Sequence, residues 1–262
     1  MKILIISNYF PPEIGAASSR IFQLAKSLNS FSFDTEVVCP FPNYPTGKIM
    51  GRYSGIYQVE NIENIKCHRL FIYPNNSSNP LMRLISMVSF ALSIWYLLFK
   101  RSTYKFEKII IQNSPLLVSF SSIILFQKLL KKSIILNVSD LWPQSAVDLG
   151  VLKENSLNHK ILKQIEQFNY NNSNKIIGQS QSILNHVLTY KKIPNFLYRN
   201  IPNIRFNKYN SLKKHQPISF IYAGLLGVAQ GVLDLVKIMH DLNLDFKFDI
   251  YGDGNQKKEI QK

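Results

Sequence analysis

Hydrophobic residues along the chain occur in two kinds of stretch that alternate with each other. Short runs rich in Ile and Val predict strands that are buried on both faces. Longer stretches with an apolar residue every three or four positions predict amphipathic helices. The predicted strands are residues 3–6, 35–39, 66–73, 108–112, 133–138, 175–178, 196–199, 218–223 and 246–251. The predicted helices are residues 21–28, 84–99, 155–170, 180–190 and 233–242, with a last helix beginning near Gln256.

This alternation predicts an α/β fold with a mostly parallel sheet covered by helices, arranged as two Rossmann-like domains. Residues 1–203 hold enough elements for a complete first domain. Residues 204–216 are polar and rich in lysine, which is typical of a linker. Residues 217–262 repeat the order of strand, glycine loop and helix. They contain about two strands, too few to bury a doubly wound sheet, so we expect only the start of a second domain.

The first twenty residues read as a strand, a loop of small residues and a helix. Pro11 and Pro12 lack amide hydrogens, so the strand cannot continue through them. The small residues 15–18 follow, and then the helical pattern begins. Such a loop lies at the carboxyl end of a strand, where α/β sheets bind ligands, and a helix start favours an anion such as phosphate. The alternative is a plain turn without a ligand. No G-x-G-x-x-G is present, which argues against a nicotinamide or flavin site.

Two further stretches have an unusual composition. Residues 40–47 combine three prolines with two aromatic residues, which predicts an ordered loop near the site or a surface loop without a role.

Residues 84–99 carry no charge and lie between Arg83 and Lys100. As a helix they would measure about 24 Å, less than the roughly 30 Å of a bilayer core. They predict either a buried helix or one that lies in a membrane interface beside basic anchors. The apolar residues 116–126, followed by three lysines, repeat this pattern.

The formal net charge of +15 is compatible with nucleic acid, an anionic membrane surface or anionic small molecules. The basic residues are spread along the chain, and no zinc-finger or RNA-recognition signature accompanies them. We therefore expect no nucleic-acid partner.

Cys39 and Cys67 form no metal-binding spacing and are expected to be buried thiols in a reducing cytoplasm. The five histidines likewise form no metal spacing.

Three segments resemble one family of enzymes. They are ISNYFPPEIGAASSR at residues 6–20, SDLWPQSAVDLGVL at residues 139–152 and YAGLLGVAQG at residues 222–231. Together they resemble nucleotide-sugar glycosyltransferases of the GT-B fold. Within that fold they are similar to the retaining family 4 transferases of bacterial O-antigen and capsule assembly, and especially to fucosamine transferases. The resemblance covers the whole chain.

The resemblance implies two Rossmann-like domains that face each other across a cleft. The first domain would take the acceptor, and the second would take the nucleotide-sugar donor, for which a UDP-sugar is expected. It implies retention of the anomeric configuration and no cofactor or metal, so amides, helix dipoles and basic side chains would neutralise the leaving diphosphate. It also implies a lipid-linked saccharide acceptor and a peripheral location on the cytoplasmic face of the cell membrane.

Candidate site residues follow from matching positions. Asp140 and Glu13 are the candidate catalytic residues. Asp140 could instead cap the following turn, and Glu13 could be a solvated loop charge. The candidate donor- and phosphate-binding residues are Gly15, Ala16, Arg20, Gly224, Gly227, Gln230, Gly231, Gly252 and Gly254. The chain departs from the wider family at Leu225, where an arginine is frequent, and at Gln230, where a lysine is frequent.

The two-glutamate motif that follows in the family's second domain would lie beyond Lys262. This departure leaves two hypotheses of different classes. The first is a sugar transferase that acts on a lipid-linked acceptor. The second is a truncated, non-catalytic remnant that binds membrane or partner subunits. On either hypothesis, residues 1–262 alone are expected not to transfer sugar at a useful rate.

Overall fold

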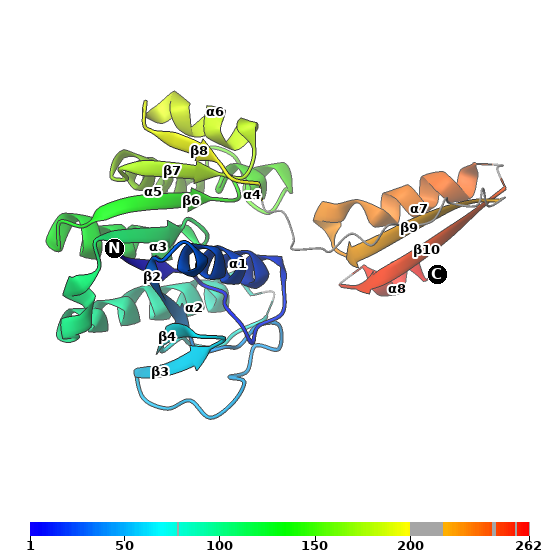
Figure 1. The fold of residues 1–262 in the computed structure, drawn as a ribbon. Coiled ribbons are helices and arrows are strands. Elements are labelled where there is room, and N and C mark those ends of the chain that lie inside the picture. The colour runs from blue at the N-terminus through cyan, green and yellow to red at the C-terminus, as the bar shows by residue number, and fades with distance from the viewer. Residues whose placement is uncertain (78, 200–216, 243–244, 255, 262) are drawn as a thin grey trace. The chain divides into compact units, whose positions relative to one another are not determined.

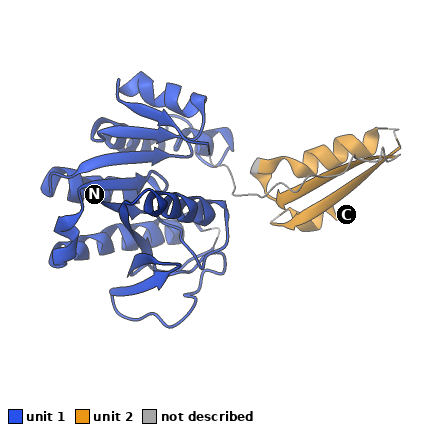
Figure 2. Cartoon of the chain, viewed as in Figure 1, with its two compact units in different colours: residues 1–201 blue, residues 202–262 orange. Residues whose placement is uncertain are grey.

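The computed structural model describes residues 1–77, 79–199, 217–242, 245–254 and 256–261. The chain divides into two compact units, Met1–Ile201 and Pro202–Lys262, which Figure 2 colours separately. The predicted linker, residues 204–216, lies outside the described residues.

The first unit is built on an eight-stranded sheet with the order β3-β4-β2-β1-β5-β6-β7-β8 (Figure 1). The strands are β1 (Lys2–Ile6), β2 (Asp34–Pro40), β3 (Tyr57–Ile62), β4 (Ile65–Leu70), β5 (Lys108–Gln112), β6 (Ser133–Val138), β7 (Lys175–Gly178) and β8 (Asn195–Leu197). Neighbouring strands are parallel except for the edge strand β3, which runs antiparallel to β4. The predicted α/β class is therefore confirmed.

Helices connect these strands and cover the sheet. They are α1 (Ala16–Ser30), α2 (Pro80–Ser93), α3 (Leu116–Ile123), α4 (Gln144–Asp148), α5 (Leu157–Asn171) and α6 (Gln181–Tyr190). Two short 3₁₀ helices, η1 (Ile94–Phe99) and η2 (Arg101–Lys105), follow α2, and a π-helical turn, η3 (Ile124–Leu129), continues α3. Ser180 caps α6, because its hydroxyl accepts the amide of Ile183.

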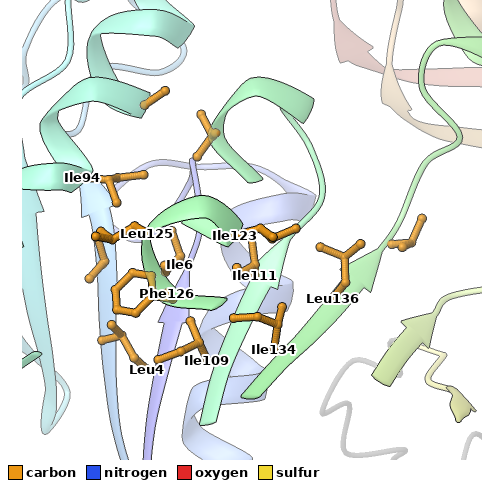
Figure 3. Packing of buried hydrophobic residues seen from close by; sticks show 14 of the residues in the cluster. Leu4, Ile6, Ile94, Ile109, Ile111, Ile123, Leu125, Phe126, Ile134 and Leu136 are labelled. Atoms are coloured by element: carbon orange, nitrogen blue, oxygen red, sulfur yellow. The ribbon is translucent and has the colours of Figure 1, made fainter. Parts of the chain in front are cut away.

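The buried side chains form one cluster on each face of the sheet. On one face, the apolar side chains of α1 pack onto alternate residues of β1, β2 and β5. On the other face α2, η1, α3 and η3 cover Leu4, Ile6, Ile109 and Ile111, as Figure 3 shows. Alternate residues of one strand thus enter different clusters, which is why these strands read as continuous hydrophobic runs.

Phe126 lies at the centre of the second cluster and is completely buried. Phe126→Ala is expected to lower the free energy of unfolding by about 3–5 kcal/mol, because it removes packing and leaves a cavity. Urea denaturation followed by tryptophan fluorescence measures this, since both tryptophans, Trp95 and Trp142, lie in the first unit. The exposed Phe196 provides the control, and its replacement by Ala is expected to change stability by about 0.5 kcal/mol at most. Equal losses for the two variants would contradict this account of the core.

The direction of the chain across the sheet reverses between β1 and β5. From β1 the chain passes through α1 to β2 on one side, and it later returns to the other side of β1 as β5. Ligands of open α/β sheets bind outside the carboxyl ends of the strands at such a point. The loop after β1 therefore occupies the position at which a site is expected.

The second unit is a single strand–helix–strand repeat with a short final helix. Strands β9 (Ile218–Leu225) and β10 (Phe246–Asp253) are parallel, and α7 (Val232–Asp241) connects them. A 3₁₀ turn, η4 (Val228–Gln230), precedes α7, and α8 (Lys257–Ile260) follows β10. This matches the predicted order, although Gly224 and Leu225 prolong the strand rather than begin the loop.

Several elements of the first unit differ from the sequence prediction, among them α4, which was not predicted. The edge strand β3 was not predicted, because its residues are only partly buried and several are polar. The apolar helix begins at Pro80, four residues earlier than predicted, because the Asn79 side chain accepts the amide of Leu81 and caps it.

α2 and η1 together span 20 residues, which is long and apolar enough to cross a membrane by length and composition alone. The prediction that this helix is too short to span was therefore wrong.

Candidate functional site

A pocket of about 190 Å³ opens at the carboxyl end of β1. It is lined by Tyr9, Glu13, Ile14, Gly15, Ala16, Ala17, Ser18 and Tyr44. The tyrosine rings meet edge to face, with centroids 5.4 Å apart. Burial is the main cause that raises the pKa of the Tyr9 hydroxyl above its usual value, so this group is protonated at neutral pH and can donate a hydrogen bond.

The first turn of α1 forms one wall of this pocket. Gly15 is the N-cap and supplies no side chain, and its carbonyl accepts the amide of Ser19. The amides of residues 16–18 precede the first intrahelical bond, so they are available to an anion. The Ser18 hydroxyl is buried, with 2% of the residue exposed, and has no hydrogen-bond partner in the described structure. The wall thus offers several polar hydrogens to a bound group.

Glu13 lines the pocket, but its carboxylate is already engaged. One oxygen, Oε1, accepts the amides of Asn43 and Tyr44 at 2.9 Å each, and Oε2 accepts the amide of Phe10 at 3.3 Å. The residue is 3% exposed, so it is not a solvated loop charge. Burial raises the pKa of this carboxyl above its usual value, although the three amides oppose the shift. The three hydrogen bonds of the Glu13 carboxylate hold the loops around the pocket together. The predicted catalytic role of Glu13 stays a prediction.

Arg20 lies one turn further along α1 and does not line the pocket. Its side chain is half-buried, and burial lowers the pKa of its guanidinium. Among the described residues, no ion pair joins Arg20 to Glu13. The predicted role of Arg20 in binding a phosphate stays a prediction.

Asp140 follows β6 at the same carboxyl edge of the sheet. Its Oδ1 accepts the amide of Leu141 at 2.8 Å and the hydroxyl of Ser145 at 2.5 Å, so it organises the turn before α4. The side chain is exposed and therefore accessible to a substrate. Asp140 does not line the pocket of Tyr9 and Tyr44. Both the turn-capping role and access to substrate are compatible with this position.

Sequence reasoning missed a row of amide side chains along the carboxyl edge. Asn8 follows β1, Asn113 follows β5, and Asn137 lies at the end of β6. All three are at least nine-tenths buried, and each keeps one polar side-chain atom without a partner in the described structure. The polar character of these strand ends, after apolar runs, is the signal that could have identified them. The other missed residue, Ser18, could have been identified from its place in the first helical turn.

The second unit places its candidate residues at the ends of its two strands. Gly227 precedes η4, Gln230 ends it and is exposed, and Gly231 caps α7. Gly231 has φ +63°, a left-handed conformation that favours glycine. The free amides of the following helix start point to the same kind of anion site as in α1.

Gly252 and Gly254 have a structural explanation for their missing side chains. Gly224 and Gly252 are register partners of β9 and β10. A Cβ on Gly252 would lie 2.0 Å from the carbonyl oxygen of Gly224, and one on Gly254 would lie 2.2 Å from that of Leu226. Close backbone contact thus requires glycine at both positions, and their predicted role in donor binding stays a prediction.

The described residues contain no group of three or more His, Cys, Asp or Glu side chains that could hold a metal ion. Two histidines bond to carboxylates instead, and a third, His159, accepts the amide of Asn155 at Nδ1. His68 Nε2 lies 2.5 Å from Glu36, and His186 Nε2 lies 3.1 Å from Glu166.

No known family profile matches the chain, and no curated protein sequence matches it. Solved structures do match the chain. The catalytic domain of starch synthase IV from Arabidopsis thaliana, bound to ADP and acarbose, matches with a TM-score of 0.61 and 14% identity, over 99% of this chain and 69% of that one. The lipopolysaccharide outer core galactosyltransferase WaaB, in its apo form, matches with a TM-score of 0.59 and 16% identity, over 100% of this chain and 63% of that one.

This chain thus spans about two thirds of the length of either structure. Both structures are glycosyltransferases with the GT-B fold, and at these identities the likeness concerns the fold alone. The expected GT-B fold is confirmed.

Proposed function

We propose that this chain belongs to a retaining glycosyltransferase that moves a sugar from a nucleotide sugar, most simply a UDP-sugar, to a saccharide acceptor. The observation that carries the proposal is the pocket at the start of α1, where free amides and the unpartnered Ser18 hydroxyl meet at the reversal point of the sheet. A diphosphate oxygen placed there would accept hydrogen bonds from these groups.

The charges near α1 suit a leaving group that becomes more negative during the reaction. When the bond between the anomeric carbon and the diphosphate breaks, the added charge on the diphosphate is stabilised by the dipole of α1 and by the guanidinium of Arg20. Such stabilisation requires no metal ion. Starch synthase IV, which shares the fold, is bound to ADP, a nucleoside diphosphate. In the second unit, the helix start at Gly231 is a separate candidate phosphate site.

The polar carboxyl edge of the sheet suits a sugar acceptor. Asn8, Asn113 and Asn137 each hold an unpartnered buried polar atom, and sugar hydroxyls can both donate and accept. Asp140 lies at this edge, exposed, with Oδ1 held by Ser145. We assign to its carboxylate the stabilisation of positive charge that develops on the anomeric carbon.

The test has two parts: release of UDP from a panel of UDP-sugars by a longer form of the chain that includes the two-glutamate motif, and calorimetric titration of the 262-residue chain with UDP. Asp140→Asn is expected to lower the transfer rate about 100-fold, the usual cost of losing one stabilising group in the transition state, with little change in UDP affinity. Ser145→Ala, which removes the hydroxyl bonded to Oδ1 but keeps the carboxylate, is the matched control.

If Ser145→Ala loses as much activity as Asp140→Asn, Asp140 acts through the turn. UDP binding without UDP release by the unaltered longer form would indicate the non-catalytic alternative. Absence of UDP binding would contradict the proposal.

We also propose that the first unit lies on an anionic membrane surface at the cytoplasmic face, where its acceptor is a lipid-linked saccharide. α2 exposes apolar residues along one side, at positions 81, 84, 85, 88 and 92, and these recur at helical spacing. Leu81 is 62% exposed and Leu92 is 66% exposed. We refer to these five residues as the apolar stripe.

The opposite side of α2 and η1 packs into the core through Phe90, Ala91, Ile94 and Leu97. The helix therefore lies along the folded unit, and a spanning orientation would require it to leave the core. The serines on its third side bond to the preceding segment, where Ser89 accepts the amide of Tyr73 and Ser93 donates to the carbonyl of Phe71. The apolar stripe is left without a partner among the described residues, which suits a bilayer interface.

The charge around the apolar stripe is strongly positive. Between residues 65 and 139 the only acidic residue is Glu107. Apart from the buried Arg69, the basic residues of this stretch are Lys66, Arg83, Lys100, Arg101, Lys105, Lys108, Lys128, Lys131 and Lys132. Anionic lipid headgroups attract such a segment, by about 1 kcal/mol for each exposed basic residue near the surface.

The start of α2 is tied to the wall of the pocket. Asn76, in the segment before α2, donates to the carbonyl of Pro45, next to the pocket residue Tyr44. Arg83, in the first turn of α2, donates to the carbonyl of Ser77. A lipid-linked acceptor could thus keep its lipid in the bilayer under α2 while its saccharide reaches the carboxyl edge of the sheet beside the pocket.

A further inference from the structure

Arg69 is a completely buried charged residue that the proposed reaction does not use. It lies on β4, and its guanidinium donates to three groups from three different segments. Nη1 donates to the carbonyl of Pro40 at 3.1 Å, Nη2 donates to the carbonyl of Pro11, and Nε donates to Glu60 Oε1 at 2.6 Å. One side chain thus connects the loop after β1, the end of β2 and the edge strand β3.

Glu13 makes the complementary connection between the first two of these segments. It belongs to the loop after β1, and its carboxylate accepts amides from Phe10 in the same loop and from Asn43 and Tyr44 after β2. Arg69 therefore supplies only donors and Glu13 only acceptors across the same junction. The guanidinium also lowers the pKa of the Glu13 carboxyl, against the larger effect of burial, so the two charges act on each other.

The composition of the junction explains why it needs the donors of Arg69. Pro11, Pro12, Pro40 and Pro42 lie in the two segments, and proline has no amide hydrogen. These segments therefore have more carbonyl acceptors than amide donors, and they cannot complete a backbone ladder with each other. Arg69 donates to two of the carbonyls, and Glu13 accepts three of the remaining amides.

We propose that Arg69 and Glu13 act as one brace that holds the two walls of the pocket at a fixed separation. One wall carries Tyr9 and the other carries Tyr44, and their rings are 5.4 Å apart. Both are positioning residues, since they act on the ligand through the walls. The inference rests on the proposed function only in taking this pocket as the binding site.

The brace is tested by hydrogen exchange at the amides of Phe10, Asn43 and Tyr44 in Arg69→Met, Glu13→Gln and the double variant. Arg69 bonds only to carbonyls and Glu60, so its loss accelerates exchange at these amides only if it acts together with Glu13. We expect exchange at least about 10-fold faster in each single variant, which is the effect of losing one hydrogen bond to a charged group. The double variant is expected to resemble the single variants, because the two residues form one unit.

Arg101→Met and Glu154→Gln are the matched controls, because both side chains are exposed. Exchange at the buried strand amides of β5 and β6 reports general stability. Unchanged exchange at residues 10, 43 and 44 in Arg69→Met would overturn the brace, and so would an increase of equal size in β5 and β6. Where Arg69→Met does not fold, Arg69→Lys, which keeps the charge but loses the planar fork of donors, decides by the same criterion.

A second measurement separates the brace from the proposed function. Calorimetric titration with UDP is expected to give about 10-fold weaker binding in both single variants than in the unaltered chain. If the exchange result is obtained and the unaltered chain does not bind UDP, the brace stands and the proposed function fails. If UDP affinity is unchanged in variants whose exchange has increased, the brace does not position this pocket, and the inference is overturned.

Discussion

Replacing four residues of the apolar stripe by serine, in the variant L81S/I85S/V88S/L92S, is expected to abolish most binding to anionic vesicles. All four side chains are 37–66% exposed in the folded unit, so their replacement leaves the core intact. If each contributes about 1 kcal/mol, half or less of the value for full burial, the variant loses about 4 kcal/mol. This corresponds to roughly a 1000-fold weaker partition coefficient. Flotation with vesicles of phosphatidylcholine and phosphatidylglycerol measures the loss.

The matched control replaces two exposed phenylalanines away from α2. Phe31 follows α1, which covers the other face of the sheet, and Phe196 lies on the edge strand β8. They are 76% and 65% exposed, and F31S/F196S is expected to bind vesicles like the unaltered chain. Pure phosphatidylcholine vesicles are expected to bind more weakly, because they lack the negative charge that attracts the basic residues. Equal binding to both kinds of vesicle, or equal loss in both variants, would contradict a membrane surface at α2.

Gly15→Ala is expected to weaken UDP binding about 10- to 100-fold. Gly15 has φ +154° and ψ 163°, a backbone region that is essentially restricted to glycine. A side chain there costs about 1–3 kcal/mol of strain, which the loop relieves by changing conformation. Since Gly15 is the N-cap of α1, that change moves the amides of residues 16–18 that are proposed to bind the diphosphate. Calorimetric titration with UDP measures the affinity.

Gly55→Ala is the control for strain alone. Gly55 also has a positive φ, +70°, and a Cβ built on it would meet no atom within 4 Å. It does not line the pocket, so its replacement is expected to affect stability while UDP affinity stays unchanged. If Gly15→Ala retains full affinity, or if Gly55→Ala loses as much as Gly15→Ala, the start of α1 is not the phosphate site.

The sequence allowed prediction of most buried elements because their pattern is local. β5, β6 and β7 begin and end at the predicted residues, since each is an apolar run bounded by polar positions. β3 could not be predicted in this way. It is an edge strand that pairs only with β4, so its side chains alternate between partial burial and exposure without a strong apolar pattern.

The candidate site was predictable in its place but not in its internal contacts. Glu13, Gly15 and Ala16 do line one pocket at the end of the first strand. The engagement of Glu13 depends on Asn43 and Tyr44, about thirty positions later, and that of Arg69 depends on Pro11, 58 positions earlier. Such contacts follow from the order of strands in the sheet, which the local pattern of a sequence does not specify.

The position of α2 along the chain also has a consequence for protein synthesis. α2 and η1 end at Phe99, whereas β5, α3 and β6, which complete the core beneath them, extend to Val138. At about 5–20 residues per second, the ribosome needs roughly 2–8 s to make this intervening stretch. During that interval the face of α2 that later meets β5 and α3 has not yet been covered. A nascent chain therefore exposes two apolar faces of α2 during this interval, and on the proposed membrane location, contact with the bilayer would begin before the first unit has finished folding.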